Sequence, residues 1–245
     1  MSGSLILGGS RGIGRFLARE SLQSGCRTVV VGRNFDPDRL PRLDGAEIVL
    51  GDLTQPEVTA RALGDDWRAW HRIFWVAGAY WRAPLAQTDA DRLRQMTEIH
   101  FLAFAGAMAN LHRLMAASPP QPGDQLPHLV VIGSTASWRI CHHETAYSAL
   151  KAAQAHLIRG FSRELIGDFP GTKVSLFNSS GLKKPEACRE RGLDPWKSMT
   201  PEAVAGIVWR EAAAQTAPFA ELNILRCSDW SMLIQHWASA PESPF

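Results

Sequence analysis

The sequence predicts one α/β domain in which helices cover both faces of a mostly parallel sheet of seven strands. Short apolar segments recur along the 245 residues, and most of them are followed by a longer segment with helical spacing. A strand that is apolar at every position is buried on both faces, as happens when helices pack on both sides of a parallel sheet. No repeat, low-complexity tract or long linker divides the chain, so residues 1–245 are expected to form a single domain.

The expected strands are apolar runs that end at glycines or polar residues. The first, SLILG, runs directly into a glycine-rich turn, and the others have the same short length. They lie at residues 4–8, 27–32, 46–52, 72–78, 128–133, 172–178 and 220–225.

The expected helices carry start and stop signals at their ends. The first stops at Gly25, and the longest has Thr88 as its expected N-cap and ends at the proline-rich segment 118–127. Thr200 is followed by proline, which is the order typical of a helix start. The helices are expected at residues 12–24, 56–63, 89–117, 144–168 and 200–214.

Composition argues against several classes of function. The formal net charge of +2 gives no strong positive field for nucleic acid or a membrane surface. The N-terminus lacks the basic segment of a secretory signal, and the longest mostly apolar segment, 101–111, is too short to cross a bilayer. The four cysteines form no CxxC pair, which indicates free thiols in a reducing compartment. We therefore expect a cytoplasmic protein that binds neither nucleic acid nor membranes.

A glycine-rich turn follows the first expected strand. Gly8, Gly12 and Gly14 in GGSRGIG have GxxxGxG spacing and open the first helix. Such a turn lets the backbone approach a pyrophosphate, while the helix N-terminus offers unpaired N–H groups and a partial positive charge. The alternative is a strand-to-helix turn without a ligand, but its place in an alternating α/β chain favours a nucleotide site.

The end of the second expected strand indicates which dinucleotide binds. Proteins that bind NAD tend to place an acid there for the ribose 2′-hydroxyl, whereas arginine accommodates the 2′-phosphate of NADP. Here Arg33 follows the strand, and no acid occurs before Asp36. Arg11, inside the glycine turn, can reach the same phosphate, and Asp52 after the third strand is placed to meet the adenine edge.

The segment TAYSALKAA places Tyr147 and Lys151 four residues apart, on one face of an expected helix. Ser134 lies thirteen residues before Tyr147. Together with GGSRGIG and the Ala77–Gly78 pair after the fourth strand, these residues resemble the short-chain dehydrogenase/reductase family over nearly the whole chain. The resemblance implies a doubly wound, Rossmann-like fold and an NADPH-dependent reduction of a ketone or aldehyde, or the reverse oxidation.

The resemblance also implies roles for individual residues. Tyr147 is the general acid in reduction and the base in oxidation, Lys151 lowers its pKa and holds the nicotinamide ribose, and Ser134 donates a hydrogen bond to the substrate oxygen. The residues expected to contact the cofactor are Gly8, Ser10, Arg11, Gly12, Ile13, Gly14, Arg33, Asn34, Asp52, Leu53, Ala77, Gly78, Tyr147, Lys151 and Gly181.

The chain departs from the family pattern at several positions. Val76 stands where the family has asparagine before Ala-Gly, and Ser180 stands where it has proline. His100 occupies the place of the family's fourth catalytic residue, an asparagine. Because an unperturbed histidine titrates near pH 6.5, His100 is expected to carry a proton between solvent and Lys151, with an ionisation below neutral pH.

Substrate is expected to meet loops at the carboxyl ends of the strands, including the segment near 179–199. Trp81, Trp138, Trp196 and His142 fall in such loops, which favours a bulky or aromatic carbonyl compound, although the tryptophans could instead pack on their own domain. The CHHE segment at 141–144 contains metal-binding residue types. Adjacent ligands do not easily converge on one ion, so no metal site is predicted.

The C-terminal tail, residues 226–245, carries apolar residues at helical spacing. Trp230, Leu233, Ile234 and Trp237 form an i, i+3, i+4, i+7 stripe that must be buried, either on its own domain or at a subunit contact. Because the family resemblance implies dimers or tetramers, a homodimer or homotetramer is expected. A non-catalytic, NADP-sensing protein on the same fold is the alternative to an enzyme.

Overall fold

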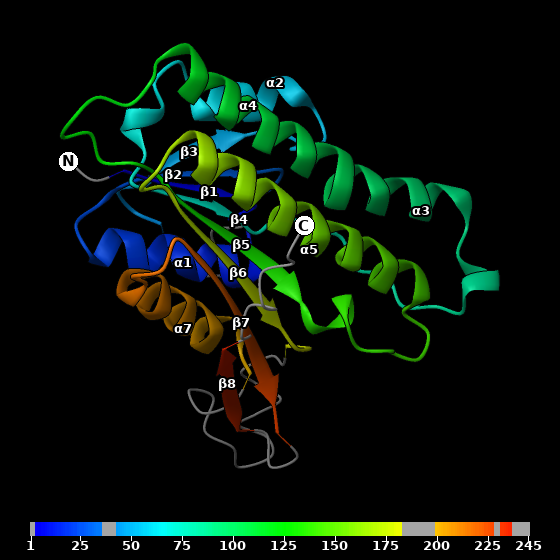
Figure 1. Cartoon of the computed structure of the whole chain (residues 1–245). Helices are drawn as coiled ribbons and strands as arrows, with labels where there is room; N and C mark the ends of the chain where they lie inside the picture. The colour runs from blue at the N-terminus through cyan, green and yellow to red at the C-terminus, as the bar shows by residue number, and fades with distance from the viewer. Residues whose placement is uncertain (1–2, 36–42, 183–198, 228–230, 237–245) are drawn as a thin grey trace, which may run out of the picture.

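The computed structural model describes residues 3–35, 43–182, 199–227 and 231–236, which form one eight-stranded sheet and the helices on its two faces (Figure 1). The strand order is β3-β2-β1-β4-β5-β6-β7-β8. The first seven strands are parallel, and β8 is antiparallel to β7. The strands are β1 (Gly3–Leu7), β2 (Arg27–Gly32), β3 (Glu47–Leu50), β4 (Arg72–Trp75), β5 (His128–Ser134), β6 (Lys173–Ser179), β7 (Phe219–Arg226) and β8 (Met232–His236).

Two layers of helices enclose the sheet. Helices α1 and α7 lie on one face, while α2, α4 and α5 cover the other (Figure 1). The predicted α/β fold with a doubly wound, mostly parallel sheet is therefore confirmed. The helices are α1 (Gly12–Gln23), α2 (Pro56–Leu63), α3 (Ala90–Thr97), α4 (Ala103–Ala117), α5 (Thr145–Asp168) and α7 (Pro201–Ala214).

The continuously apolar strands supply both halves of the core. On β1, Leu5 and Leu7 pack in the cluster beneath α2, α4 and α5, while Ile6 between them packs in the cluster beneath α1 and α7. Successive side chains of a strand point to opposite faces, so a strand buried on both sides must be apolar at every position.

The long helix expected at 89–117 is interrupted. A π-helical turn, Glu98–Leu102, separates α3 from α4, and His100 lies within it. The N-cap is Asp89 rather than the expected Thr88, because the Asp89 carboxylate accepts a hydrogen bond of 2.7 Å from the backbone N–H of Arg92. A π turn inserts an extra residue into the hydrogen-bonding pattern and is frequent at functional sites.

The tail forms an eighth strand, where the sequence predicted a stripe of apolar residues at helical spacing. Residues 232–236 pair with β7, so the expected helical stripe is wrong over these residues; Trp230 and Trp237 lie outside the described residues. Ile234 packs on the core, whereas Leu233 points outward with about half of its surface exposed. Pairing with β7 satisfies backbone groups that a sheet edge would leave open.

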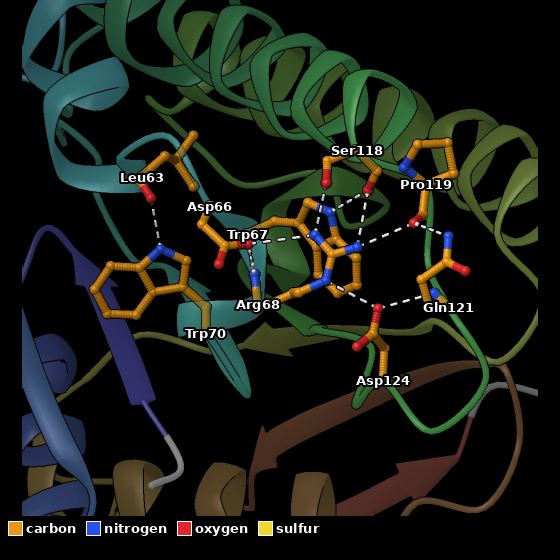
Figure 2. Close-up of polar contacts among 9 residues, drawn as sticks. All are labelled: Leu63, Asp66, Trp67, Arg68, Trp70, Ser118, Pro119, Gln121 and Asp124. Atoms are coloured by element: carbon orange, nitrogen blue, oxygen red, sulfur yellow. Dashed lines mark hydrogen bonds and ion pairs between the residues drawn. The ribbon is translucent and has the colours of Figure 1, made fainter.

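A cluster of polar contacts joins two loops at the amino ends of the strands (Figure 2). The Arg68 guanidinium stacks over the Trp67 ring and donates hydrogen bonds to Asp124 at 2.9 Å and to the Ser118 hydroxyl at 2.8 Å. Trp67 Nε1 donates to the Ser118 carbonyl oxygen at 2.9 Å. The turn after α2 is thereby joined to the segment that follows α4.

Candidate active site

The glycine turn brings β1, α1 and β4 into close contact. Gly8 has φ of +100°, and a Cβ there would lie 2.5 Å from the backbone nitrogen of Ala77. A Cβ on Gly14 would lie 2.4 Å from the carbonyl oxygen of Gly8, so Gly14 permits the helix to pack against the turn. No side chain caps the N-terminus of α1, and its first turn holds no acid. This cradle fits the phosphates of a dinucleotide.

The expected adenosine end of the site lies where β2 and β3 end. The Asp52 carboxylate accepts hydrogen bonds from the Thr54 backbone at 3.0 Å and the Thr54 hydroxyl at 2.9 Å, and Arg33 lies 3.5 Å away. Burial alone would raise the pKa of Asp52, but the Thr54 hydrogen bonds and the Arg33 guanidinium hold it below its usual range. Arg33 remains more than half exposed, so its guanidinium is accessible to a phosphate.

One continuous cleft of about 800 Å³ runs from the glycine turn to Tyr147 along the carboxyl ends of the parallel strands. Two of the expected cofactor contacts, Gly14 and Asn34, do not line it. The other expected residues that line it are Gly8, Ser10, Arg11, Gly12, Ile13, Arg33, Asp52, Leu53, Ala77, Gly78, His100, Ser134, Tyr147, Lys151 and Gly181.

Ser134 and Tyr147 meet at the far end of this cleft. Ser134 is the last residue of β5, Tyr147 is in the first turn of α5, and both side chains line this end of the cleft. Burial, with a smaller contribution from the Glu144 carboxylate, raises the pKa of Tyr147, although the hydrogen bond with Ser134 lowers it. Burial has the largest effect on this pKa and Lys151 is not among the groups that change it, so the role that the resemblance implies for Lys151 stays a prediction.

Lys151 lies one helical turn beyond Tyr147 and is buried. Its Nζ donates to Oε1 of Gln154 at 2.7 Å and to the backbone carbonyl of Ile132 at 3.3 Å. Burial lowers the pKa of Lys151 to about 7, because a low-dielectric surrounding disfavours the ammonium.

His100 is also buried, and it faces both the loop after β4 and Tyr147. Its Nε2 lies 2.6 Å from the carbonyl oxygen of Ala79, and its ring meets the Tyr147 ring edge-on at 5.6 Å. Burial, followed by the charge of Lys151, lowers the pKa of His100 to about 3. The expected ionisation just below neutral pH is therefore wrong, since the imidazole stays neutral there.

The cleft mouth beside Tyr147 is polar. Tyr80 donates to Oε1 of Glu144 at 2.7 Å, its ring packs edge-on against Tyr147 at 5.0 Å, and Arg82 lies 3.9 Å from the same oxygen. Burial, followed by the hydrogen bond to Glu144, raises the pKa of Tyr80 to about 12. The described residues around this mouth are Tyr80, Arg139, Cys141, Glu144, Leu182 and Arg226.

Of the side chains expected to hold substrate, the three that lie in the described residues, Trp81, Trp138 and His142, do not line the cleft. Trp138 instead donates to Asn223 at 3.1 Å, Trp81 lies beneath the Arg92 guanidinium, and the His142 ring packs against the His143 ring at a tilt. Trp196 lies outside the described residues. The sequence analysis did not predict that Tyr80 and Glu144 line the cleft. For Glu144, its position three residues before Tyr147 could have indicated a place near the phenol.

Metal-ligand clusters and membrane-spanning helices are both absent from the described ranges. No three or more His, Cys, Asp or Glu side chains are grouped there as metal ligands. None of the helices there has the combined length and apolar character needed to cross a membrane.

Comparison with known proteins identifies the family. The family model for short chain dehydrogenases matches residues 4–174. The chain belongs to the short-chain dehydrogenase family. This short-chain dehydrogenase is 26% identical over 182 residues to the rhamnolipids biosynthesis 3-oxoacyl-[acyl-carrier-protein] reductase of Pseudomonas aeruginosa, and the match covers 70% of each chain.

Solved structures agree on the fold of this short-chain dehydrogenase. A short-chain dehydrogenase from Streptomyces avermitilis superposes with a TM-score of 0.72 at 22% identity, covering 91% of this chain and 88% of the other. A 3-oxoacyl-(acyl-carrier-protein) reductase from Agrobacterium tumefaciens with NADP bound gives 0.69 at 21% identity, covering 91% and 92%.

Proposed function

We propose that this short-chain dehydrogenase uses NADP(H) to interconvert a ketone or aldehyde and the corresponding alcohol. The observation that carries this proposal is the meeting of Ser134 and Tyr147 at one end of a cleft that begins at the glycine turn. The family is one of oxidoreductases, so the cleft geometry and the family membership support the same class of reaction.

The residues at the glycine turn fit NADP. The open N-terminus of α1 would hold the pyrophosphate, and Arg11 and Arg33 would hold the 2′-phosphate. Lys151 would hold the nicotinamide ribose, and Asp52 would face the adenine. When bound, this cofactor supplies or accepts the hydride. The relative from Agrobacterium, which holds NADP, supports this choice.

Ser134 and Tyr147 would act on the carbonyl oxygen. Ser134 would donate a hydrogen bond to that oxygen as negative charge develops, and Tyr147 would transfer its phenolic proton to it. In the oxidation, the Tyr147 phenolate would accept the alcohol proton. His100 would keep the loop after β4 in place beside Tyr147, since its neutral ring bonds to Ala79.

The cleft mouth favours a carbonyl compound with polar groups over a purely aromatic one. The Glu144 carboxylate and the Tyr80 hydroxyl lie next to Tyr147, and Arg139 and Arg226 also line the cleft. Because two relatives are 3-oxoacyl reductases, a 3-oxoacyl thioester belongs in the substrate panel beside simple ketones and aldehydes.

The test follows NADPH consumption with this panel for wild-type protein, Tyr147→Phe and Tyr80→Phe. Tyr147→Phe is expected to lower the rate by about 10²–10⁴-fold while NADPH binding persists, because only the proton donor is removed. Tyr80→Phe, which removes the other phenol of the cleft but not the proton donor, is expected to change substrate KM and to leave kcat within a few-fold of wild type. NADPH binding without turnover of any compound would point instead to a cofactor-sensing protein.

A homodimer or homotetramer in the cytoplasm remains part of the proposal. Light scattering of the full-length protein tests the assembly, and a monomeric mass would contradict it.

A further inference from the structure

Gln154 lies on the same face of α5 as Tyr147 and Lys151. Tyr147, Lys151, Gln154 and Ile158 are separated by four, three and four residues, so their side chains share one face of the helix, directed toward the sheet. Gln154 has none of its surface exposed, and the neighbouring inward positions Ala155, Ile158 and Leu165 are all apolar. A buried amide at such a position needs a partner.

That partner is the Lys151 amine. Oε1 of Gln154 accepts the 2.7 Å hydrogen bond from Lys151 Nζ, while Nε2 of Gln154 is buried without a partner. The opposite amide orientation would place two donors against each other, so the lysine fixes the orientation of the amide. The unpaired Nε2 carries a desolvation penalty that an apolar residue would avoid. Stability alone therefore does not explain glutamine at this position.

The surroundings of Lys151 make the choice of acceptor significant. The titratable groups that face it are Tyr147 on α5 and His100 on the π-helical turn, and β5 contributes the Ile132 carbonyl. Within the described ranges, Lys151 forms no ion pair with a carboxylate. The shorter of its two hydrogen bonds is therefore to a neutral amide oxygen, Oε1 of Gln154.

We propose that Gln154 is a positioning residue for the reaction, whose amide oxygen anchors the Lys151 amine in the cleft without trapping its proton. An amide oxygen accepts a hydrogen bond from either the ammonium or the neutral amine. A carboxylate would favour the ammonium strongly. When Lys151 gives a proton to the Tyr147 phenolate and later regains one from water, its N–H···Oε1 bond to Gln154 persists through both steps.

This inference rests on the proposed function for its meaning, but its test does not require turnover. Full-length protein carrying [ε-¹³C]lysine is titrated by NMR, first alone and then with NADP⁺. The chain has only five lysines, and the Lys151 signal is identified by its loss in Lys151→Arg. The compared proteins are wild type, Gln154→Leu, Gln154→Glu and the control Ser162→Ala, which alters another buried polar side chain of α5.

Gln154→Leu removes an acceptor of the ammonium, so the Lys151 titration midpoint is expected to fall by about half a pH unit or more. Gln154→Glu adds a negative charge, so the midpoint is expected to rise by at least a similar amount. Ser162→Ala is expected to titrate like wild type. A purely structural role for Gln154 would not shift the midpoint in opposite directions.

Equal midpoints in wild type, Gln154→Leu and Gln154→Glu would overturn the proposal. If Gln154→Glu fails to fold, Gln154→Met provides a second variant without the acceptor, and an unchanged midpoint there would be equally decisive. Where a ketone is turned over, the pH at which reduction loses half its rate should follow the same order. Shifted midpoints in a protein that reduces no carbonyl compound would refute the proposed function and leave the Lys151 anchor intact.

Discussion

The Nε2 atom of His100 lies 2.6 Å from the carbonyl oxygen of Ala79, and through this contact the π-helical turn holds the segment after β4. Nε2 is also 3.2 Å from the Ala79 nitrogen, but the shorter contact to the carbonyl makes it the protonated nitrogen. Nδ1 is buried without a partner. His100 therefore holds the loop after β4 through a hydrogen bond from a neutral imidazole.

The pH–rate profile should show no His100 ionisation between pH 5 and 8. The pKa of His100 is about 3, so the ring is neutral throughout this range. His100→Asn, which keeps an amide donor, is expected to retain the profile, while His100→Ala loses the tie and about tenfold in rate. An acidic limb present in wild type and absent in His100→Asn would contradict this.

Gly78→Ala should disturb the same contact. A Cβ on Gly78 would lie 2.7 Å from Cε1 of His100, so the imidazole must move. Overpacking of this kind destabilises by about 1–3 kcal/mol, which urea denaturation measures. The double variant Gly78→Ala/His100→Ala should lose less than the sum of the single changes, because the clash disappears. Additive losses would show that the ring does not meet position 78.

His128 should make the protein sensitive to mild acid. Its Nε2 lies 2.6 Å from the Ser175 hydroxyl, and burial, followed by the charges of Arg72 and Lys173, lowers its pKa to about 3. An unfolded histidine titrates near pH 6.5. Between these two values the unfolded state binds the proton, so stability is full above pH 6.5 and falls as the pH decreases toward 3.

His128→Gln, which cannot titrate, should flatten this dependence. The slope of unfolding free energy between pH 6.5 and 5 is expected to fall by up to about 1.4 kcal/mol per pH unit. Urea denaturation at several pH values measures the slope, independently of any change in absolute stability. Parallel curves for the two proteins would exclude His128 as the cause.

Arg33 should select NADPH over NADH. Loss of one charge-assisted contact to phosphate corresponds to about 1.5–3 kcal/mol, or roughly 10- to 100-fold in affinity. Arg33→Asp is therefore expected to erase or reverse the preference in a fluorescence titration. The control is Arg27→Ala, since Arg27 pairs with Glu47 at the start of β2 and does not line the cleft. Equal wild-type affinities for the two cofactors would reject the assignment.

Arg68→Met should destabilise the fold without changing the chemistry. The change removes charge-assisted hydrogen bonds that join Asp124 and Ser118 to the Trp67 turn (Figure 2). These residues lie before β4 and β5, at the amino ends of the strands, whereas the cleft lies at the carboxyl ends. We expect a loss of about 2–3 kcal/mol in urea denaturation, with unchanged kcat. Arg94→Met, which breaks only an exposed pair with Asp91, should change stability by less than about 0.5 kcal/mol. Similar losses in both variants would refute this role for Arg68.

The strands and the glycine turn could be predicted because local sequence determines them. Burial on both faces requires continuous apolar residues, and the close approach of Gly14 to Gly8 leaves no room for a side chain. The π-helical turn carried no such signal, since one inserted residue hardly changes helical periodicity. Leu233 and Ile234 fit a helical stripe or a strand equally well, and pairing with β7 decides between them.

The site was predictable where it follows a motif and not where it depends on burial. Ser134, Tyr147 and Lys151 have fixed spacings, so sequence alone brought them together. The pKa values of His100 and Lys151 depend on how deeply each side chain is enclosed, which periodicity does not reveal. Gln154 was not predicted because the function of a buried amide in a helix depends on its partner, here Lys151, and the sequence alone does not show that contact.

The antiparallel hairpin of β7 and β8 divides the sheet into two kinds of strand pairing. In the hairpin, paired residues are close in sequence, as Arg226 and Met232 are. In the parallel part of the sheet they are far apart, as Leu5 of β1 and Ile73 of β4 are. Parallel strands are joined by long connections, so the chain loses loop-closure entropy before the strand contacts can form. This high contact order slows folding. A hairpin forms within microseconds, so the tail strand can form early. The central strands, which line the cleft at their carboxyl ends, are expected to set the overall folding rate.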